Sequence, residues 1–244
     1  IWGTLDSTGT VLSFDDFFNV GYKTATIIHS DDVPGEEYTQ GFVEAFEAGG
    51  GTIVGRQRIP EYTMDFGSYI ANIGKADCCV FWDHGAFVAP FLTSYAGYGV
   101  KLPILTPYNG PASETALAES GDACLGMIGS TDYSPLIDTD MNRQFVDAFV
   151  QKYKIYPRPE SARGYIATTM FLEAVKSTGG DTSHAAINNA LKIIKVDTPV
   201  GVLSFTPEGQ MIGNVFIAKV IKIDDRYIWE PIHTYSQIIL EEPK

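Results

Sequence analysis

The first half of the chain alternates between apolar runs of strand length and segments with apolar residues at helical spacing. Residues 24–29 form an apolar-rich run, and an acidic loop at 30–35 separates it from a helix expected between Glu36 and the glycines at 49–51. The alternation continues as a strand from Thr52, a helix over 65–73 with Asp65 as its N-cap, a strand over 77–82, a helix over 87–98 and a strand over 101–106. This order predicts a parallel sheet with helices on both faces.

The second half has a different pattern. Three helices are expected, over 142–153, over 161–177, and from a cap at Ser183 to the region of Lys192. Residues 201–205 and 215–223 are predicted as two strands of a hairpin, because Pro207 and Gly209 hold favoured positions of a turn between them. A cluster of helices and one hairpin cannot form a doubly wound sheet alone, so we expect that part of this half is missing.

Composition argues against several classes of function. The formal net charge of −13 disfavours binding to nucleic acid, which basic surfaces recognise. No apolar stretch reaches the roughly 18 residues of a membrane-spanning helix. The loop at 30–35 lacks the glycine-rich motifs that hold dinucleotides or nucleoside triphosphates, and we expect no cofactor.

The candidate metal ligands are weak. Cys78 and Cys79 are neighbours on one predicted strand and point to opposite faces, so we expect buried thiols here and at Cys124. Asp31 and Asp32 lack the glycine and the distal glutamate of a calcium-binding loop. A solvated or helix-capping role is favoured for these two carboxylates.

Four stretches, in their order along the chain, resemble the type I periplasmic solute-binding proteins of ABC importers, and in particular the leucine/isoleucine/valine-binding branch. They are residues 5–7 ahead of a helix leading to the strand at 27–29, the helix at 35–42 leading to the glycines at 49–51, the helix at 65–70 leading to Asp77, and the hairpin segment 196–209. Their order and spacing over nearly the whole chain carry the resemblance.

The resemblance implies an α/β fold of two Rossmann-like, doubly wound lobes joined by a three-strand hinge. Residues 1–130 would form lobe two, with 224–244 returning to it, and residues 131–223 would form the returning part of lobe one. The first part of lobe one would be absent, through truncation or cleavage, or because a second chain or segment completes the lobe. The helices around Phe149 and Tyr165 would otherwise leave apolar faces uncovered.

In this family the ligand lies between the lobes, and loops that follow successive strands contact it. Carried over by position, the contacts on lobe two would be Asp6, Ser30 and its loop as far as Pro34, Asp83, His84, Tyr108 and Asn109. Arg163 on lobe one could reach an anionic ligand, although a surface salt bridge is the favoured role for it.

Two positions depart from the amino-acid-binding pattern. Pro34-Gly35 stands where a Tyr-Gly pair is frequent, and Tyr108 stands near the position of the glutamate that pairs with the ligand's ammonium group. The second departure puts an α-amino acid in doubt, although Asp6 or Asp83 could substitute for the missing carboxylate.

The aromatic groups at the predicted site favour a small organic acid, aromatic acids included, over a branched-chain amino acid. Trp82, His84 and Tyr108 could offer ring faces and polar edges, and a protonated His84 could pair with a carboxylate. For Trp82, a place in the packed face of the sheet is at least as good an interpretation, because side chains alternate along a strand.

We therefore predict an extracytoplasmic solute-binding protein, periplasmic or lipid-anchored in a Gram-positive cell, that delivers a small organic acid or amino acid to the membrane subunits of an ABC importer. The alternative is a ligand-sensing regulatory or receptor domain of the same fold. Catalysis is disfavoured, because His29 lies near Asp31 and Asp32 but no nucleophile motif such as G-x-S-x-G accompanies it. We expect no catalytic residue and no metal site.

Overall fold

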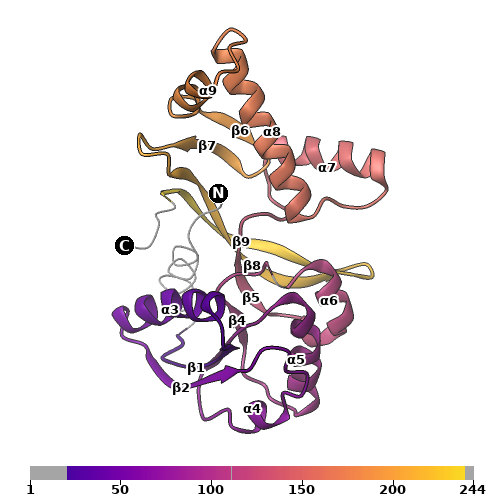
Figure 1. Cartoon of the computed structure of the whole chain (residues 1–244). Helices are drawn as coiled ribbons and strands as arrows, with labels where there is room; N and C mark the ends of the chain where they lie inside the picture. The colour runs from indigo at the N-terminus through magenta and orange to yellow at the C-terminus, as the bar shows by residue number, and fades with distance from the viewer. Residues whose placement is uncertain (1–20, 111, 240–244) are drawn as a thin grey trace. The chain divides into compact units, whose positions relative to one another are not determined.

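The computed structural model describes residues 21–110 and 112–239, so Asp6 lies outside the described residues. The chain divides into two compact units (Figure 1). Within the described residues, the first unit contains 21–131 and 217–232, and the second contains 132–216 and 233–239. We call them the N-terminal unit and the C-terminal unit and describe each by itself.

Parallel strands form the sheet of the N-terminal unit, in the order β2-β1-β3-β4-β5. Their bounds are Thr24–Ser30 for β1, Thr52–Ile59 for β2, Cys78–Trp82 for β3, Ile104–Thr106 for β4 and Ile128–Thr131 for β5. Next to β5 lies β8 (Met211–Ile223), which also pairs with β9 (Arg226–Ile239). The predicted alternation of parallel strands and helices is confirmed for this unit.

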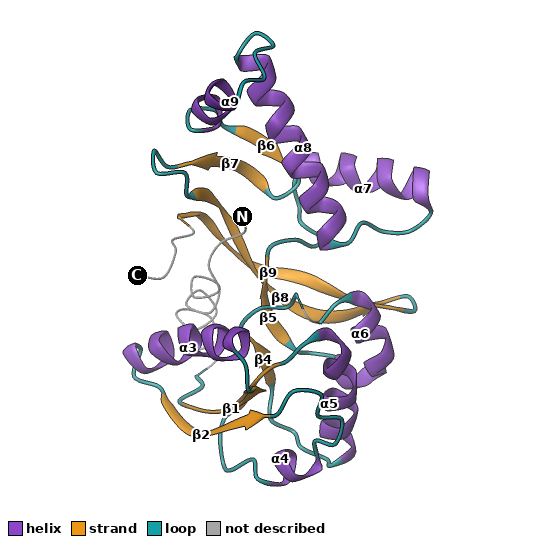
Figure 2. Ribbon diagram, viewed as in Figure 1, coloured by secondary structure: helices purple, strands orange, loops and turns teal. Residues whose placement is uncertain are grey.

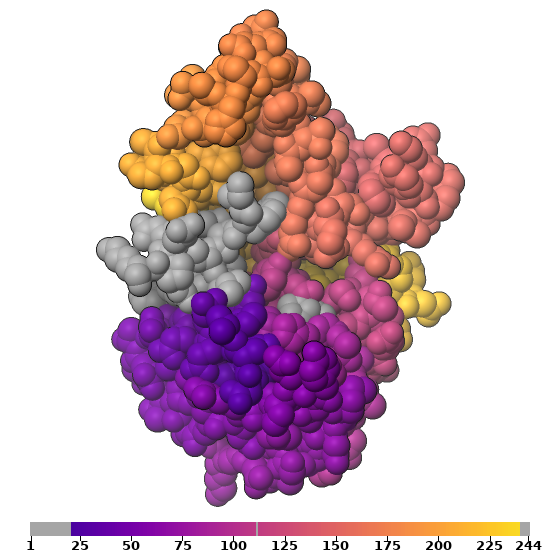
Figure 3. Space-filling view, viewed as in Figure 1, coloured from indigo at the N-terminus to yellow at the C-terminus, as the bar shows by residue number. Residues whose placement is uncertain are grey.

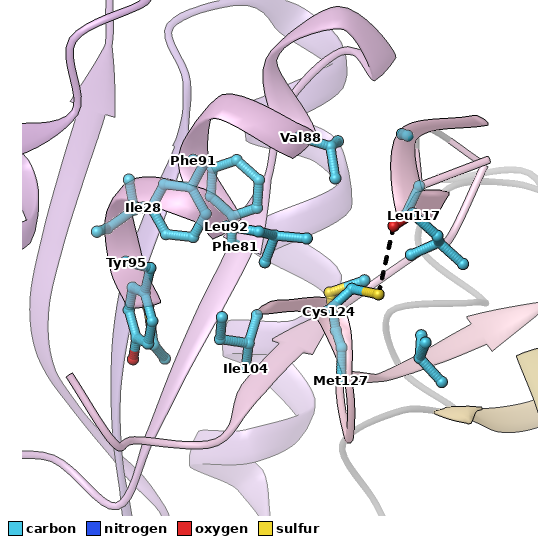
Figure 4. Close-up of a cluster of buried hydrophobic side chains, with 14 of the residues drawn as sticks. Ile28, Phe81, Val88, Phe91, Leu92, Tyr95, Ile104, Leu117, Cys124 and Met127 are labelled. Carbon is cyan, nitrogen blue, oxygen red and sulfur yellow. Dashed lines mark hydrogen bonds between the residues drawn. The ribbon is translucent and has the colours of Figure 1, made fainter. Parts of the chain in front are cut away.

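Helices cover both faces of this sheet (Figure 2). The helices are α3 (Val33–Ala48), α4 (Gly67–Ala71), α5 (Gly85–Gly97), α6 (Glu114–Ser120) and the 3₁₀ helix η1 (Gly121–Cys124). On one face α3 packs against β1, β2 and β3. On the other, Ile28 and Phe81 of the sheet join a buried apolar core with Phe91 of α5 and Leu117 of α6 (Figure 4).

The three cysteines belong to this packed interior as free thiols, which confirms the expectation for them. Burial raises the pKa of the Cys78 thiol to about 12 and that of the Cys124 thiol to about 11. A thiol that stays protonated is a poor nucleophile and a poor metal ligand. The cysteines therefore act as small apolar side chains.

Several predicted helix starts differ from the structure by one to three residues, and two of them have a clear cause. α3 begins at Val33 and not at Glu36, because Asp32 caps the helix and Pro34 is accommodated in its first turn. The N-cap of α4 is Phe66 and not Asp65, although Asp65 Oδ1 accepts a hydrogen bond of 2.9 Å from the Gly67 amide. The elements α6, β5, β6 and β9 were not predicted.

The C-terminal unit combines helices with antiparallel strands. Its elements are α7 (Asp140–Tyr153), α8 (Pro159–Ser177), α9 (His184–Leu191), β6 (Val196–Thr198) and β7 (Gly201–Phe205). Ser183 caps α9, and β7 pairs antiparallel with both β6 and β8, which confirms the predicted cap and hairpin. The described part of this unit contains no parallel sheet.

The strands β8 and β9 each run through both units, and this affects where the unit boundaries fall. Residues 217–223, which the sequence placed in lobe one, cluster with the N-terminal unit. Residues 233–239, which the sequence placed with lobe two, cluster with the C-terminal unit. The assignment of the two units to lobes of a larger protein stays a prediction.

Candidate functional site

The strand order of the N-terminal unit creates a switch point between β1 and β3. The chain winds outward from β1 in one direction and from β3 in the other, and ligands of open α/β sheets bind at the carboxyl ends of such a strand pair. His29 of β1 lies in register with Trp82 of β3. The residues that follow, Asp31-Asp32 and Asp83-His84, therefore leave the sheet side by side.

Asp32 joins these two turns. Its Oδ1 accepts hydrogen bonds from the Ser30 hydroxyl at 2.7 Å and from the Gly35 amide at 2.8 Å, and the second bond caps α3. Its Oδ2 lies 2.5 Å from Nε2 of His84. Asp32 thus takes the helix-capping role that the sequence favoured over a metal site.

The same contacts fix the protonation of the pair. Burial acts to raise the pKa of Asp32, but the hydrogen bonds from His84, Gly35 and Ser30 outweigh it and hold this pKa below its ordinary value. An ionised carboxylate can only accept, so Nε2 of His84 carries a proton. The other ring nitrogen, Nδ1, has no partner among the described residues, and the His84 side chain is 51% exposed.

Asp83 is buried beside this pair. The residue is 4% exposed, and its Oδ1 accepts a hydrogen bond of 2.7 Å from the His84 backbone amide. Burial raises the pKa of Asp83 to about 6, against the opposing effects of that hydrogen bond and of the His84 ring. Asp83 is therefore a carboxyl group that can change its charge near neutral pH.

An aromatic stack adjoins the polar group. Tyr38 of α3 stacks on Trp82 with ring centroids 4.8 Å apart and on Tyr108 with centroids 5.3 Å apart. Trp82 is 3% exposed, and its ring meets that of His84 edge-on at 5.3 Å. The indole Nε1 is buried without a hydrogen-bond partner among the described residues.

Most of the predicted site residues of the N-terminal unit come together here. Ser30 and His84 meet at Asp32, Asp83 holds the His84 backbone, and Tyr108 joins the aromatic stack. Asn109 is buried, and its backbone N–H donates to the Ser130 carbonyl at 3.0 Å. This hydrogen bond anchors the turn that carries Tyr108. Asp32 lies in the loop at 30–34 that was predicted to contact a ligand, whereas Tyr38 of α3 was not among the predicted contacts.

Arg163 lies in the C-terminal unit and forms a partly buried ion pair. Its Nε and one terminal nitrogen approach Oδ2 of Asp132 at 2.7 Å and 2.6 Å. Burial raises the pKa of Asp132 in spite of the guanidinium, and its Oδ1 is buried without a hydrogen-bond partner in the described part of the chain. The salt bridge that the sequence favoured for Arg163 is present, and its contact with a ligand stays a prediction.

Two further searches cover the described residues only. No cluster of three or more histidine, cysteine or acidic side chains there has the arrangement of a metal site. None of the helices there has both the length and the apolarity to cross a membrane. The site at the switch point is thus built from aromatic rings, carboxyl groups and one imidazole.

Residues 7–225 match a family model described as periplasmic binding protein. The chain belongs to this family. The resemblance to type I periplasmic binding proteins seen in the sequence is confirmed, and with it the α/β fold class. Members of the periplasmic binding protein family act outside the cytoplasm and bind solutes rather than catalyse reactions.

Individual relatives of this periplasmic binding protein include sequences and solved structures. Leu/Ile/Val-binding protein homolog 6 of Brucella melitensis is 26% identical over 230 residues, which are 89% of this chain and 58% of the relative. An ABC transporter substrate-binding protein from Sphaerobacter thermophilus is 26% identical, with a TM-score of 0.87 over 98% of this chain and 66% of the other.

A third relative was solved with a ligand. It is a solute binding protein of an ABC transporter from Rhodopseudomonas palustris in complex with 3,4-dihydroxybenzoic acid, 25% identical, with a TM-score of 0.83 over 97% of this chain and 66% of that one. The chain therefore spans between 58% and 66% of the length of these relatives.

Proposed function

We propose that this periplasmic binding protein captures a small aromatic carboxylic acid and delivers it to the membrane subunits of an ABC importer. The observation that carries the proposal is the juxtaposition, at the switch point, of the Trp82–Tyr38–Tyr108 stack with the Asp32–His84 pair. The first offers ring faces and the second offers a polar anchor. A branched-chain amino acid is the competing ligand class.

The aromatic part of the site suits a planar ligand. Aromatic rings stack in offset or edge-on arrangements that contribute beyond simple burial, by about 0.5–1.5 kcal/mol per pair. Trp82 adds a buried indole N–H without a partner among the described residues, and an arriving oxygen atom could accept its hydrogen bond. A ligand that combines a ring with oxygen substituents would satisfy both features.

The polar part of the site suits a carboxylate. Asp32 holds His84 through Nε2, which fixes the ring and leaves Nδ1 for another partner. In the imidazolium form Nδ1 is a donor, and it would make a charge-assisted hydrogen bond to a ligand carboxylate. In the neutral form Nδ1 is an acceptor and would repel the same carboxylate.

The relatives support both candidate ligand classes. The Rhodopseudomonas palustris protein is in complex with an aromatic acid, and the Brucella melitensis relative is named for leucine, isoleucine and valine. In this chain Tyr108, a member of the aromatic stack, stands near the position where the amino-acid-binding branch has the glutamate that pairs with the ligand's ammonium group. The absence of that carboxylate favours the aromatic acid.

A second part of the proposal concerns the C-terminal unit. An opening of about 570 Å³ lies between α7 and α8, and its lining includes the aromatic side chains of Phe145, Phe149, Tyr153 and Tyr165. Both helices lie at the molecular surface (Figure 3). Because the relatives are longer than this chain, we propose that a further segment or a second chain packs here and completes the lobe.

Nuclear magnetic resonance titrations test the ligand class directly. The Trp82 indole N–H signal, assigned with a Trp82→Phe variant, is followed while benzoate, 3,4-dihydroxybenzoate or leucine is added up to millimolar concentrations. We expect saturable shifts with the two aromatic acids and a much weaker response to leucine. Saturable binding of leucine with no response to either aromatic acid would overturn the proposal.

A further inference from the structure

We propose that Asp83 takes up a proton when an organic anion binds beside His84, so that the site accepts a monocarboxylate together with one proton. The inference rests on the proposed function, because it needs an anionic ligand at the switch point. It makes Asp83 a residue that determines which charge the site accepts, although Asp83 need not touch the ligand.

The first step is a count of charges at the site. Among the described residues, the ionisable groups that act on Asp83 are His84 at the start of α5 and Asp32 from the turn before α3. These provide two carboxyl groups and one imidazole. An incoming carboxylate would be the third acidic group around one imidazole, and neighbouring like charges disfavour ionisation of all three.

The second step decides which group takes the proton. Asp32 accepts from three donors, namely the Ser30 hydroxyl, the Gly35 amide and Nε2 of His84, and its ionised form suits all of them. Protonation of Asp32 would weaken the cap of α3 and the hold on the imidazole. Asp32 is thus a poor candidate.

Asp83 has the opposite surroundings. It is 4% exposed, and within the described part of the chain it accepts one hydrogen bond, from the His84 amide to Oδ1. A proton on Oδ2 would leave that bond in place. Burial already brings the pKa of Asp83 to about 6, so a nearby negative charge needs to add little to protonate it at neutral pH.

The step balances simply. The ligand arrives as a carboxylate, the proton comes from solvent and binds to Oδ2 of Asp83, and the summed charge of the site is unchanged. A dianion would require a second proton, and among the described residues no comparable second group adjoins Asp83. By linkage, the factor by which the ligand strengthens proton binding equals the factor by which the proton strengthens ligand binding.

The test follows the carboxyl carbon of Asp83 by carbon-13 magnetic resonance through a pH titration, in the absence and presence of saturating benzoate. We expect a midpoint near 6 in the free protein and a rise on binding, where a rise of one unit is a tenfold gain in proton affinity. Asp31, one residue from Asp32 and with a side chain that is 58% exposed, is followed in the same spectra as the internal control.

A variant separates Asp83 from His84 as the proton acceptor. Asp83→Asn keeps an oxygen for the His84 amide, so benzoate should still bind. Its benzoate affinity should depend less on pH than the affinities of wild type and of the control variant Asp31→Asn, which should depend on pH in the same way. Binding of benzoate with an unmoved Asp83 midpoint, or an unchanged pH dependence in Asp83→Asn, would overturn this inference and leave the proposed function standing. If none of the probes binds, both fail.

Discussion

Oδ2 of Asp32 lies 2.5 Å from Nε2 of His84, although the two residues are 52 positions apart in the chain. Through Oδ1 the same carboxylate caps α3 at the Gly35 amide. One side chain therefore sets the start of a helix and the orientation of the imidazole at the switch point. Stability and ligand affinity should be coupled at Asp32.

The first prediction concerns this coupling. Asp32→Ala removes the cap and should lower the free energy of unfolding by about 1 kcal/mol. It should also weaken benzoate binding, because His84 loses its anchor. Urea denaturation measures the first effect. Asp31→Ala is the matched control, because the Asp31 carboxylate is exposed and its ion pair with Arg58 is long, at 3.9 Å. Equal losses of unfolding free energy in the two variants would contradict the account.

The second prediction concerns Gly35, which lets α3 begin close to β1. A Cβ atom at this position would lie 2.3 Å from the Ser30 carbonyl oxygen and 2.6 Å from its hydroxyl. Gly35→Ala should therefore destabilise the protein by about 1–3 kcal/mol. Gly97→Ala at the end of α5 meets nothing within 4 Å and should be neutral or slightly stabilising. A neutral Gly35→Ala would show that the contact relaxes easily.

The start of α3 shows how far local patterns reach. Asp-Asp-Val-Pro-Gly reads as a loop, because proline and glycine both disfavour helix interiors. In the structure the proline occupies the first turn of α3, where its missing N–H is not needed, and the glycine in the same turn leaves no side chain to meet the Ser30 carbonyl. Only the tertiary contact with β1 decides between the two interpretations.

The third prediction concerns pH. His29 is fully buried, donates from Nδ1 to the Ser30 carbonyl at 2.8 Å and accepts from Nε of Arg56 at 3.1 Å, so its ring is neutral. Burial lowers the pKa of His29 below 6.5, and Arg56 lowers it further, while the Ser30 carbonyl and Glu36 oppose the shift. Protonation would turn Nε2 into a donor that faces the Arg56 guanidinium.

The sign of the effect follows. A lowered pKa in the folded state means that His29 stabilises the protein above 6.5, and that this contribution is lost as the pH falls from 6.5 toward the lowered value. Wild type should be more stable than His29→Gln at neutral pH, and the difference should shrink on acidification. The contribution of Asp83 to the pH dependence of stability is common to both proteins and cancels in the difference. A difference in unfolding free energy that stays constant with pH would contradict the prediction.

The fourth prediction concerns the ion pair of Arg163 and Asp132, whose side chains are 25% and 15% exposed. Arg163→Met leaves a poorly solvated carboxylate and should cost at least about 2 kcal/mol of unfolding free energy. Adding Asp132→Asn should recover much of the loss. Arg143→Met, which removes contacts with exposed Asp138 and Asp140, should be nearly neutral. If Arg163→Met had the same unfolding free energy as wild type, the prediction would be contradicted and the Arg163 guanidinium would have no structural role.

Residues of the candidate site could be predicted where they follow strands, but not where they lie within a helix. Ser30, Asp83, His84 and Tyr108 were predicted at one edge of the sheet because each follows a predicted strand, and parallel strands end at one edge of a sheet. Tyr38 has no such signal, because it lies within α3, and its contacts with Trp82 and Tyr108 depend on how α3 packs. β9 was missed for another reason: Pro231 disfavours a strand interior.

The most direct test of the central claim is the dissociation constant of benzoate for wild type, His84→Ala and Tyr108→Ala, measured by the Trp82 indole shift with leucine as the competing ligand. Each variant should bind benzoate at least roughly tenfold more weakly, a loss of about 1.4 kcal/mol, and should keep the circular dichroism spectrum of wild type. Leucine should compete poorly. Equal benzoate affinities in the three proteins, or displacement of benzoate by leucine at lower concentration, would contradict an aromatic-acid site at the β1–β3 switch point.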